Sequence, residues 1–245
     1  NVGCEVVIPE EAQEWISLAP TTRAMTELNI TLQLTANEGA KRNAVVTIQS
    51  EDGKLSVNYT IEQAVGLDYQ LALEREALIA IYNALDGDNW INNENWCSDK
   101  PVGEWYGVQA YNAGGHVYGL DLRNNNLSGV IPDDISKLKF LRMLLLDDVG
   151  ITATSDEIYN LPALNMLDLN NTGILKISPK INNLKNLVQL SLQNTREVEL
   201  PSELKGLTSL AHLFLKNIKS MEAICDVKSL EWLSIYCEDN LCISP

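Results

Sequence analysis

Histidine, cysteine, aspartate and glutamate are the side chains in this sequence whose types could support catalysis or metal binding. The 245 residues include only two histidines, His116 and His212, so few nucleophile–base pairs can form. The sequence contains no G-x-S-x-G, H-E-x-x-H, phosphate-loop or dinucleotide-binding motif, and its 33 acidic residues are too scattered to single out a glycosidase pair. We therefore predict no catalytic residue, no cofactor and no enzyme activity.

Asp86, Asp88 and Glu94 form the acidic stretch that most resembles a calcium loop. An EF-hand loop with this register would need an oxygen ligand at position 90 and glycine at position 91. The chain has Trp90 and Ile91 there instead. We therefore predict no metal site and interpret the stretch as a capping turn.

The overall charge and hydropathy exclude several classes of protein. The formal net charge is −15, which argues against binding to a nucleic-acid backbone because that binding depends on lysine and arginine. No run of about 18 apolar residues is present, so we predict no membrane span. The chain opens without a basic-then-apolar signal segment, so we expect either that the sequence is trimmed or that such a segment was removed.

A leucine pattern, L-x-x-L-x-L, recurs from Val117 to Ile235 and must position any functional surface of this half of the chain. Its middle leucines recur every 20 to 24 residues, and they are Leu120, Leu144, Leu167, Leu190, Leu213 and Leu233. A fixed period of this length indicates a solenoid. One short strand cannot bury its apolar face alone, so the units must stack to share a core.

The first unit, LDLRNNNLSGVIPDDISKLKFL, resembles the plant-type leucine-rich repeat. The resemblance implies that Asn125 caps backbone groups between coils, and that Gly129 with Ile131–Pro132 shapes the convex turn. At the position equivalent to Asn125, called the ladder position because its side chains follow one another from coil to coil, the later units have Val149, Thr172, Thr195 and Ile218. Valine and isoleucine cannot make the hydrogen bond, so we expect an interrupted ladder.

Residues 66–116 are expected to begin with an amphipathic helix over Tyr69–Leu85, because apolar residues recur there at i+4. The helix and the loop from Gly87 to Val108 resemble the N-terminal cap of plant-type repeats. That resemblance implies that Trp90, Trp96 and Trp105 cover the open core of the first coil. The cap's usual cysteines are replaced by Gly103 and Ala110, so its disulfide is absent.

Residues 1–65 alternate apolar and polar side chains with period 2, which predicts antiparallel strands. The segment resembles BACON immunoglobulin-like modules through Trp15–Ile16, Arg42 before AVVTI, and YTIEQ from Tyr59. The resemblance implies a β-sandwich that binds carbohydrate or acts as a spacer. We favour a spacer role for this module, with its aromatic residues used for core packing, because Trp15 and Tyr59 occupy apolar strand positions and are expected in the core.

Five cysteines leave at least one free thiol in a monomer. Two of them, Cys4 and Cys97, lie in the first half, and Cys225, Cys237 and Cys242 lie near the last repeat. A disulfide among these three would seal the end of the solenoid. The alternative is that they are small apolar residues of the repeat core.

The predicted fold class is therefore multidomain. An immunoglobulin-like antiparallel β-sandwich (residues 1–65) is followed by a helical, tryptophan-rich cap (66–116). An α/β leucine-rich-repeat solenoid of about six units, with a parallel concave sheet and an end cap, completes the chain (117–245).

The concave sheet of the predicted solenoid is the candidate binding surface. Stacking brings equivalent outward side chains of neighbouring coils to about 4.8 Å from one another. Two apolar or aromatic clusters interrupt this otherwise polar face, and such clusters are typical of partner interfaces. The predicted partner-binding residues are Asp121, Met143, Leu145, Asp147, Met166, Asp168, His212, Phe214, Trp232 and Tyr236. The alternative for the last aromatic residues is that the tail, residues 238–245, covers them.

We expect a non-catalytic, monomeric binding protein with a protein or glycoprotein partner. The alternative function is carbohydrate binding, through the aromatic patch or through the BACON-like module. Proteins that combine these modules resemble exported, often lipid-anchored, bacterial surface proteins. The resemblance thus implies the cell surface or periplasm of a bacterium, with any lipid anchor outside residues 1–245 and no nucleic-acid partner.

Overall fold

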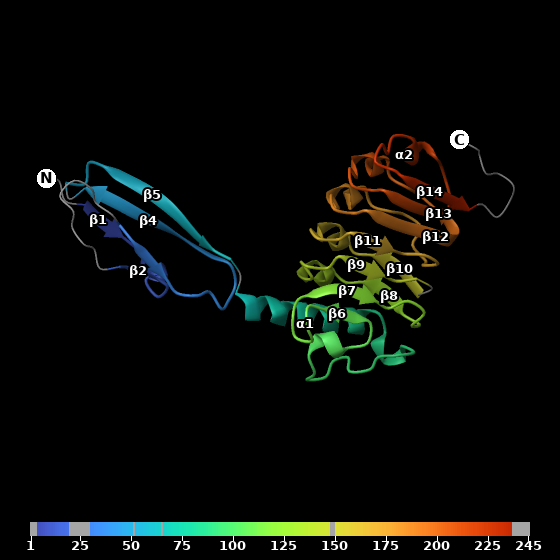
Figure 1. Cartoon of the computed structure of the whole chain (residues 1–245), viewed down its shortest axis with the longest axis horizontal. Helices are drawn as coiled ribbons and strands as arrows, with labels where there is room; N and C mark the ends of the chain where they lie inside the picture. Colours follow the sequence, from blue (N-terminus) through green and yellow to red (C-terminus); the bar gives the residue numbers. More distant parts are fainter. Residues whose placement is uncertain (1–3, 20–29, 51, 65, 148–149, 237–245) are drawn as a thin grey trace. The chain divides into compact units, whose positions relative to one another are not determined.

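A computed structural model (Figure 1) describes residues 4–19, 30–50, 52–64, 66–147 and 150–236. The chain divides into two compact units, Asn1–Ala72 and Leu73–Pro245, which are described separately below.

The first unit contains two small antiparallel sheets. One has the strand order β1-β4-β5, with β1 at Cys4–Val7, β4 at Arg42–Ser50 and β5 at Ser56–Gln63. The other pairs β2 (Ile16–Leu18) with β3 (Leu32–Leu34), and a 3-10 turn at Glu10–Ala12 precedes β2. These strands follow the alternating segments of the sequence, while an immunoglobulin-like arrangement remains a prediction.

A small apolar core lies between these strands. Its buried members are Ala12, Trp15, Ile16, Ala44 and Val46. The Arg42 guanidinium lies over the Trp15 ring, 4.5 Å from the ring centroid. The prediction that Tyr59 packs in this core is wrong, because 55% of the residue is exposed. Tyr59 pairs with buried Val46, but it lies on the edge strand β5, beyond the cover that the three-residue strands β2 and β3 provide.

The helix α1 spans Leu67–Ala84, close to the predicted range. Ala77, Leu78, Ile81 and Leu85 are each at most 1% exposed, and their spacing places them on one face. Glu74 falls on the same stripe and is fully buried. This face belongs to the same apolar cluster as the repeats.

The tryptophan-bearing segment after α1 contains the 3-10 turns Gly87–Asn89 and Val102–Glu104. Trp90, Trp96 and Trp105 are 6%, 7% and 2% exposed. Trp96 lies 4.9 Å from Trp90 and 5.3 Å from Trp105 between ring centroids. Each indole N–H donates to a backbone carbonyl, so the rings are buried without an unpaired donor.

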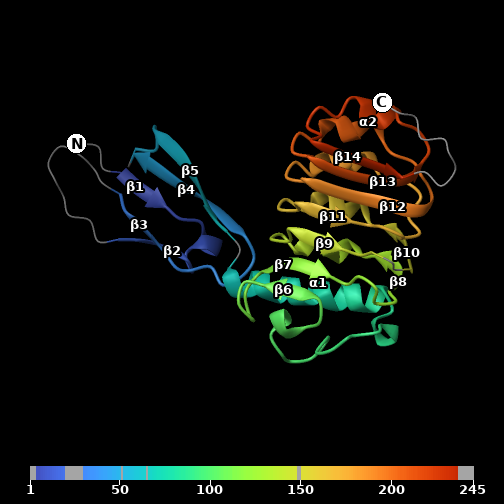
Figure 2. The same cartoon turned by 45° about the vertical axis from the view of Figure 1, so that its right-hand side comes forward.

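A seven-stranded sheet forms the second unit, in the order β14-β13-β12-β11-β9-β7-β6 (Figures 1 and 2). Only β6 among these strands is antiparallel to its neighbour. The bounds are Val108–Ala110 (β6), Val117–Asp121 (β7), Met143–Leu145 (β9), Met166–Asp168 (β11), Gln189–Val198 (β12), His212–Ile218 (β13) and Trp232–Tyr236 (β14). The order follows the sequence, as expected for stacked coils.

The return half of each coil carries short helices and a minor sheet. The 3-10 helices are Asp133–Lys137, Asp156–Asn160, Pro179–Asn183 and Ser202–Gly206, and the last coil has the short helix α2, Glu222–Cys225. Strand β8 (Ser128–Ile131) pairs in parallel with β10 (Gly150–Thr154). Gly129, the second residue of β8, has a φ of 135°, and a Cβ there would clash with the Ala84 carbonyl oxygen.

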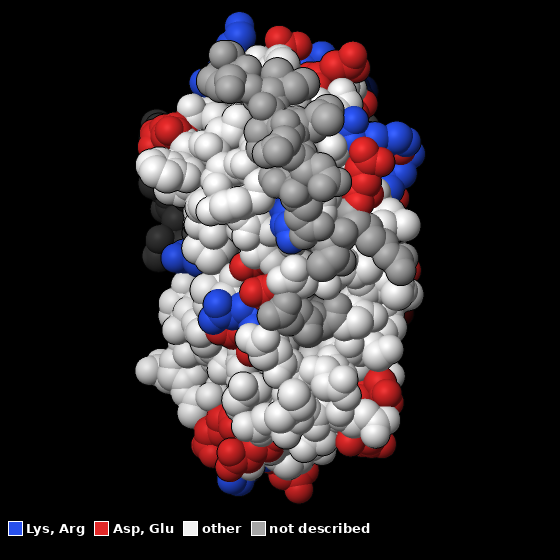
Figure 3. All heavy atoms as spheres, turned by 90° about the vertical axis from the view of Figure 1, so that its right-hand side faces the viewer, with Lys and Arg blue, Asp and Glu red and all other residues white. Residues whose placement is uncertain are grey.

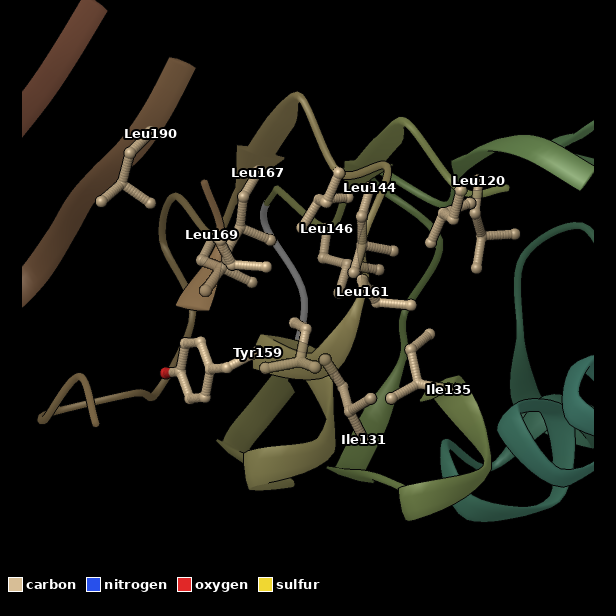
Figure 4. Close-up of a cluster of buried hydrophobic side chains, with 14 of the residues drawn as sticks. Leu120, Ile131, Ile135, Leu144, Leu146, Tyr159, Leu161, Leu167, Leu169 and Leu190 are labelled. Atoms are coloured by element: carbon tan, nitrogen blue, oxygen red, sulfur yellow. The ribbon is translucent and has the colours of Figure 1, made fainter. Parts of the chain in front are cut away.

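The core of the second unit consists of rows of aliphatic side chains that run across the coils (Figure 4). One row contains the predicted middle leucines, which the strand register aligns. Leu120, Leu144, Leu167, Leu190 and Leu213 are each at most 1% exposed. Burial of each side chain stabilises the fold by roughly 1.5–3 kcal/mol. The sixth member, Leu233, is 42% exposed.

Asparagines shape the turns between the strands and the return segments. Asn124, Asn126, Asn171 and Asn217 have positive φ, which asparagine tolerates better than most residues. Asn125 is 1% exposed and bonds the backbone of Asn92 twice, accepting from its N–H at 2.7 Å and donating to its carbonyl at 2.9 Å.

The later ladder positions differ from Asn125. Buried Thr172 donates to the Leu169 carbonyl at 2.8 Å, and Ile218 is half-buried without a polar side-chain atom. Val149 and the side chain of Thr195 lie outside the described residues. The side-chain ladder is therefore interrupted at Ile218.

Candidate partner-binding surface

The strand register places the outward side chains of the seven-stranded sheet in columns. The first column is Gly119, Met143, Met166, Gln189, His212 and Trp232. The second is Asp121, Leu145, Asp168, Ser191, Phe214 and Ser234. In a third row Gln193, Lys216 and Tyr236 are paired. Nine of the ten predicted binding residues therefore lie in these columns, and Asp147 lies two residues after the end of β9.

The beginning of this surface is acidic, with one arginine. Arg123 binds Asp121 with two nitrogens, at 2.8 Å from Nε to Oδ1 and 2.7 Å from Nη2 to Oδ2. The hydrogen bond from Arg123 lowers the pKa of Asp121. The same bond raises the pKa of Arg123, and the charges of Asp168 and Asp147 contribute to this rise. The guanidinium therefore hydrogen-bonds Asp121, while Asp147 and Asp168 act on it through their charge.

A cavity of about 550 Å³ adjoins this acidic group at the β6 side of the sheet. Its lining residues are Tyr106, Gly107, Val108, Gln109, Asp121, Arg123 and Asn124. It extends the outward surface past the first parallel strand, β7, and offers donors, acceptors and a partly exposed aromatic ring. A partner side chain could enter there without displacing the core.

Asp168 lies in a less polar environment than Asp121. Burial raises the pKa of Asp168, and the nearby charge of Asp147 acts in the same direction, whereas a hydrogen bond from the Asn170 N–H at 3.0 Å opposes it. Asp147 accepts a hydrogen bond from the Asn171 amide at 3.1 Å. A positive side chain from a partner would relieve the repulsion between the two carboxylates.

The predicted apolar spot beside these carboxylates is smaller than expected. Met143 and Met166 are paired across β9 and β11 and are half-buried. Leu145 is only 7% exposed, so the prediction that it offers an exposed contact is wrong. It lies between Asp121 and Asp168 in its column, and neighbouring side chains cover it. Two methionines thus carry the accessible apolar area.

The opposite end of the surface is aromatic. Trp232 is 61% exposed and Tyr236 is 58% exposed. His212 pairs with Trp232 across β13 and β14, and Phe214 lies two residues further along β13; both are half-buried. The tail that was the alternative cover for this end, residues 238–245, lies outside the described residues. So do Cys237 and Cys242, while Cys225 is an exposed free thiol.

Charged side chains do not form one continuous patch on the side of the molecule shown in Figure 3. There, lysine and arginine atoms mostly lie beside aspartate or glutamate atoms, and broad uncharged areas separate these groups. In the described ranges, no group of three or more His, Cys, Asp or Glu side chains could hold a metal ion.

His116 follows Gly114 and Gly115 in the hairpin between β6 and β7 and is mostly buried. Its side chain is 19% exposed, and Nδ1 lies 2.8 Å from Oε1 of buried Glu74. Oε2 of Glu74 accepts from the Val117 N–H at 2.8 Å, and the imidazole stacks on Phe140 at 3.9 Å. The position of Glu74, four residues before Leu78 on the apolar stripe, was a signal for this contact.

These features define a class of protein, an array of stacked leucine-bearing coils with a parallel sheet. Residues 117–243, more than half of the chain, match the family model described as a leucine-rich repeat region. The chain belongs to the leucine-rich-repeat family. Residues 5–64 match the BACON model, described as a putative binding domain, N-terminal.

Solved structures with the same fold include plant and bacterial proteins. The chain is 20% identical to the BIR2 ectodomain from Arabidopsis thaliana, with a TM-score of 0.53 and coverage of 66% of this chain and 94% of that one. For PEPR1-AtPEP1 the identity is 23% and the TM-score is 0.55, and the match covers 67% of this chain and 25% of that one. For a leucine-rich repeat protein from Bacteroides thetaiotaomicron the identity is 16% and the TM-score is 0.52, and the match covers 85% of this chain and 42% of that one.

The second and third of these matches extend over less than half of the matched chain. No match was found among curated proteins. Within the described ranges, none of the helices has the length and apolar character needed to cross a lipid bilayer.

Proposed function

We propose that this chain is a non-catalytic binding protein whose seven-stranded sheet docks a protein partner. The observation that carries the proposal is the exposure of large side chains in columns that a solvated face would fill with polar groups. Trp232 and Tyr236 are more than half exposed at one end, and Met143 with Met166 is accessible at the other. Tryptophan, tyrosine and methionine are enriched at protein interfaces.

The acidic end specifies the chemistry of the partner. Asp121 pairs with the Arg123 guanidinium, and the charges of Asp147 and Asp168 also act on that group, which leaves an excess of negative charge beside the two methionines. A segment that combines lysine or arginine with an aliphatic side chain would satisfy both features. Charge complementarity of this kind increases the association rate and selects the partner.

The remaining parts of the chain have supporting roles in this proposal. The helix α1 and the tryptophan segment act as the cap of the solenoid, which their shared core with the repeats supports. For residues 5–64, which match the BACON model of a putative binding domain, we propose an immunoglobulin-like spacer, because the Trp15 side chain is buried in the core. We place the protein outside a bacterial cell as a monomer, because its matches include an ectodomain and a Bacteroides protein.

The test is cross-linking of the purified chain to extracellular proteins of candidate host cells, followed by measurement of affinity for each captured protein. Two variants probe the two ends, Trp232→Ala with Tyr236→Ala, and Met143→Asp. Val130→Asp is the matched control, because Val130 is 47% exposed on β8, outside the seven-stranded sheet. Circular dichroism verifies that each variant folds.

We expect each binding variant to weaken the complex at least tenfold, since central interface residues often contribute this much. The control should bind as the unchanged chain does. Equal binding by all variants would exclude the seven-stranded sheet. A glycan array provides the competing outcome: binding of a glycan that Phe214→Ala with Trp232→Ala abolishes would replace the protein partner with carbohydrate.

A further inference from the structure

An open cleft of about 610 Å³ lies away from the columns, on the turns that connect the last two coils. Its lining residues are Lys205, Leu207, Thr208, Asp226, Lys228 and Ser229. Lys205 belongs to the 3-10 helix before β13, and Lys228 follows α2 before β14. Neither segment contributes a residue to the proposed partner-binding surface.

The two lysines of this cleft differ from their neighbours because neither forms an ion pair with a described carboxylate, including Asp226 of the same cleft. Lys176 and Lys219 both pair with Glu199, and Lys180 pairs with Asp156. Among the described residues, neither Lys205 nor Lys228 forms an ion pair or a side-chain hydrogen bond. Two ammonium groups therefore face one cleft without a fixed partner.

The local charge balance strengthens this contrast. Residues 169–245 contain eight Lys and Arg against eight Asp and Glu, whereas residues 1–168 contain ten against twenty-five. The cleft thus lies in the part of an acidic protein in which formal charges balance, away from the negative excess. An anion would be repelled less here than by the rest of the molecule.

Other polar groups in the cleft restrict the type of anion. Asp226 would repel a plain anion but can accept hydrogen bonds from ligand hydroxyls, and Thr208 offers a hydroxyl of its own. The Ser229 hydroxyl donates to the Leu207 carbonyl at 2.9 Å, which leaves its lone pairs free to accept from a ligand. Leu207 is 1% exposed and provides an apolar floor.

We infer that this cleft binds a small carboxylate ligand that also carries several hydroxyl groups, the chemistry of an acidic sugar. The carboxylate lies between Lys205 and Lys228, and the hydroxyls donate to Asp226 and Ser229. The site is independent of the proposed partner-binding surface, and either can fail without the other.

Titration of the full chain with three probes at low ionic strength tests this inference. The probes are glucuronate, glucose, which keeps the hydroxyls, and acetate, which keeps the carboxylate. Isothermal calorimetry gives the affinity, and NMR shifts of backbone amides near Thr208 and Ser229 locate the site. We expect saturable binding of glucuronate only, and weaker binding as salt is added.

Variants assign the effect to the cleft. Lys205→Gln with Lys228→Gln should weaken glucuronate binding by about tenfold or more, because two charge-assisted contacts are lost. Lys219→Gln is the matched control and should leave the affinity unchanged, as should Trp232→Ala. Equal affinity for acetate and glucuronate, retained binding in the double variant, or no glucuronate binding at low salt would overturn the inference.

Discussion

The two ends of the leucine-rich-repeat solenoid differ in how completely the leucine of the apolar row is shielded from water. At the first coil, residues of α1 and three tryptophans belong to the same apolar cluster as Leu120, which is 1% exposed. At the last described coil, Leu233 occupies the equivalent position in the row and is 42% exposed. The contrast shows that stacking buries an interior leucine completely, whereas an end requires additional covering residues.

The largest expected effect comes from opening the covered end. Trp96→Ala should lower the free energy of unfolding by about 3–5 kcal/mol, because Trp96 contacts both other tryptophans and truncation leaves a cavity. Trp232→Ala is the matched change at the other end and should cost less than about 1 kcal/mol, since the side chain is mostly exposed. Urea denaturation measures both; equal costs would contradict the contrast.

The next comparison lies within the leucine row itself. Leu213→Ala should cost about 2–5 kcal/mol, because Leu213 is fully buried between two coils. Leu233→Ala removes the same atoms from a position that keeps 42% exposure and should cost clearly less. A thermal denaturation series of the two variants checks the order. A reversed order would show that Leu233 is covered in solution.

A smaller effect is expected from the polar contact beneath the covered end. Glu74→Ala should cost about 1–3 kcal/mol, because the Val117 N–H and His116 lose a buried acceptor. Glu76→Ala is the control from the same helix: that side chain is 63% exposed, and its contact with Lys137 spans 3.4 Å. Chemical denaturation of both variants separates the buried contact from a loss of charge.

The smallest effect concerns the carboxylates between the two ends. The raised pKa of Asp168 means that its charged form costs stability above that pKa, and that this cost disappears as pH falls through it. Asp168→Asn should therefore stabilise the fold slightly at pH 7, by less than about 1 kcal/mol, with a shrinking gain in acid.

Asp121 has a lowered pKa and should behave in the opposite way. Its contribution to stability is present at neutral pH and is lost as pH falls below the ordinary range of an aspartate. Asp121→Asn should thus destabilise the fold at pH 7. Denaturation of both variants at several pH values tests the two signs, and a stabilising Asp121→Asn would contradict the assignment.

The features that the sequence alone predicted depend on periodicity. The spacing of the middle leucines predicted the register, because only one alignment of the coils brings Leu144 beside both Leu120 and Leu167. The outward columns follow from the same alternation, so the positions of Met166 and Asp168 could be predicted before their exposure was known. The apolar stripe of α1 was predictable for the same reason.

The features that were missed depend on contacts between distant residues. Glu74 and His116 are 42 positions apart, and no period relates them. The burial of Leu145 depends on the side chains beside it in the column, and the exposure of Tyr59 depends on how far β2 and β3 reach. Alternation identifies the face on which a residue lies, whereas its accessibility depends on neighbouring elements.

The sequential strand order has a consequence for how the solenoid opens. Each coil exchanges hydrogen bonds only with the coils before and after it, so the molecule behaves as a one-dimensional chain of coupled units. Local opening should begin where a unit has a single neighbour and little covering. Amide hydrogens of β14 should therefore exchange with solvent soonest, and protection should increase coil by coil toward the tryptophans.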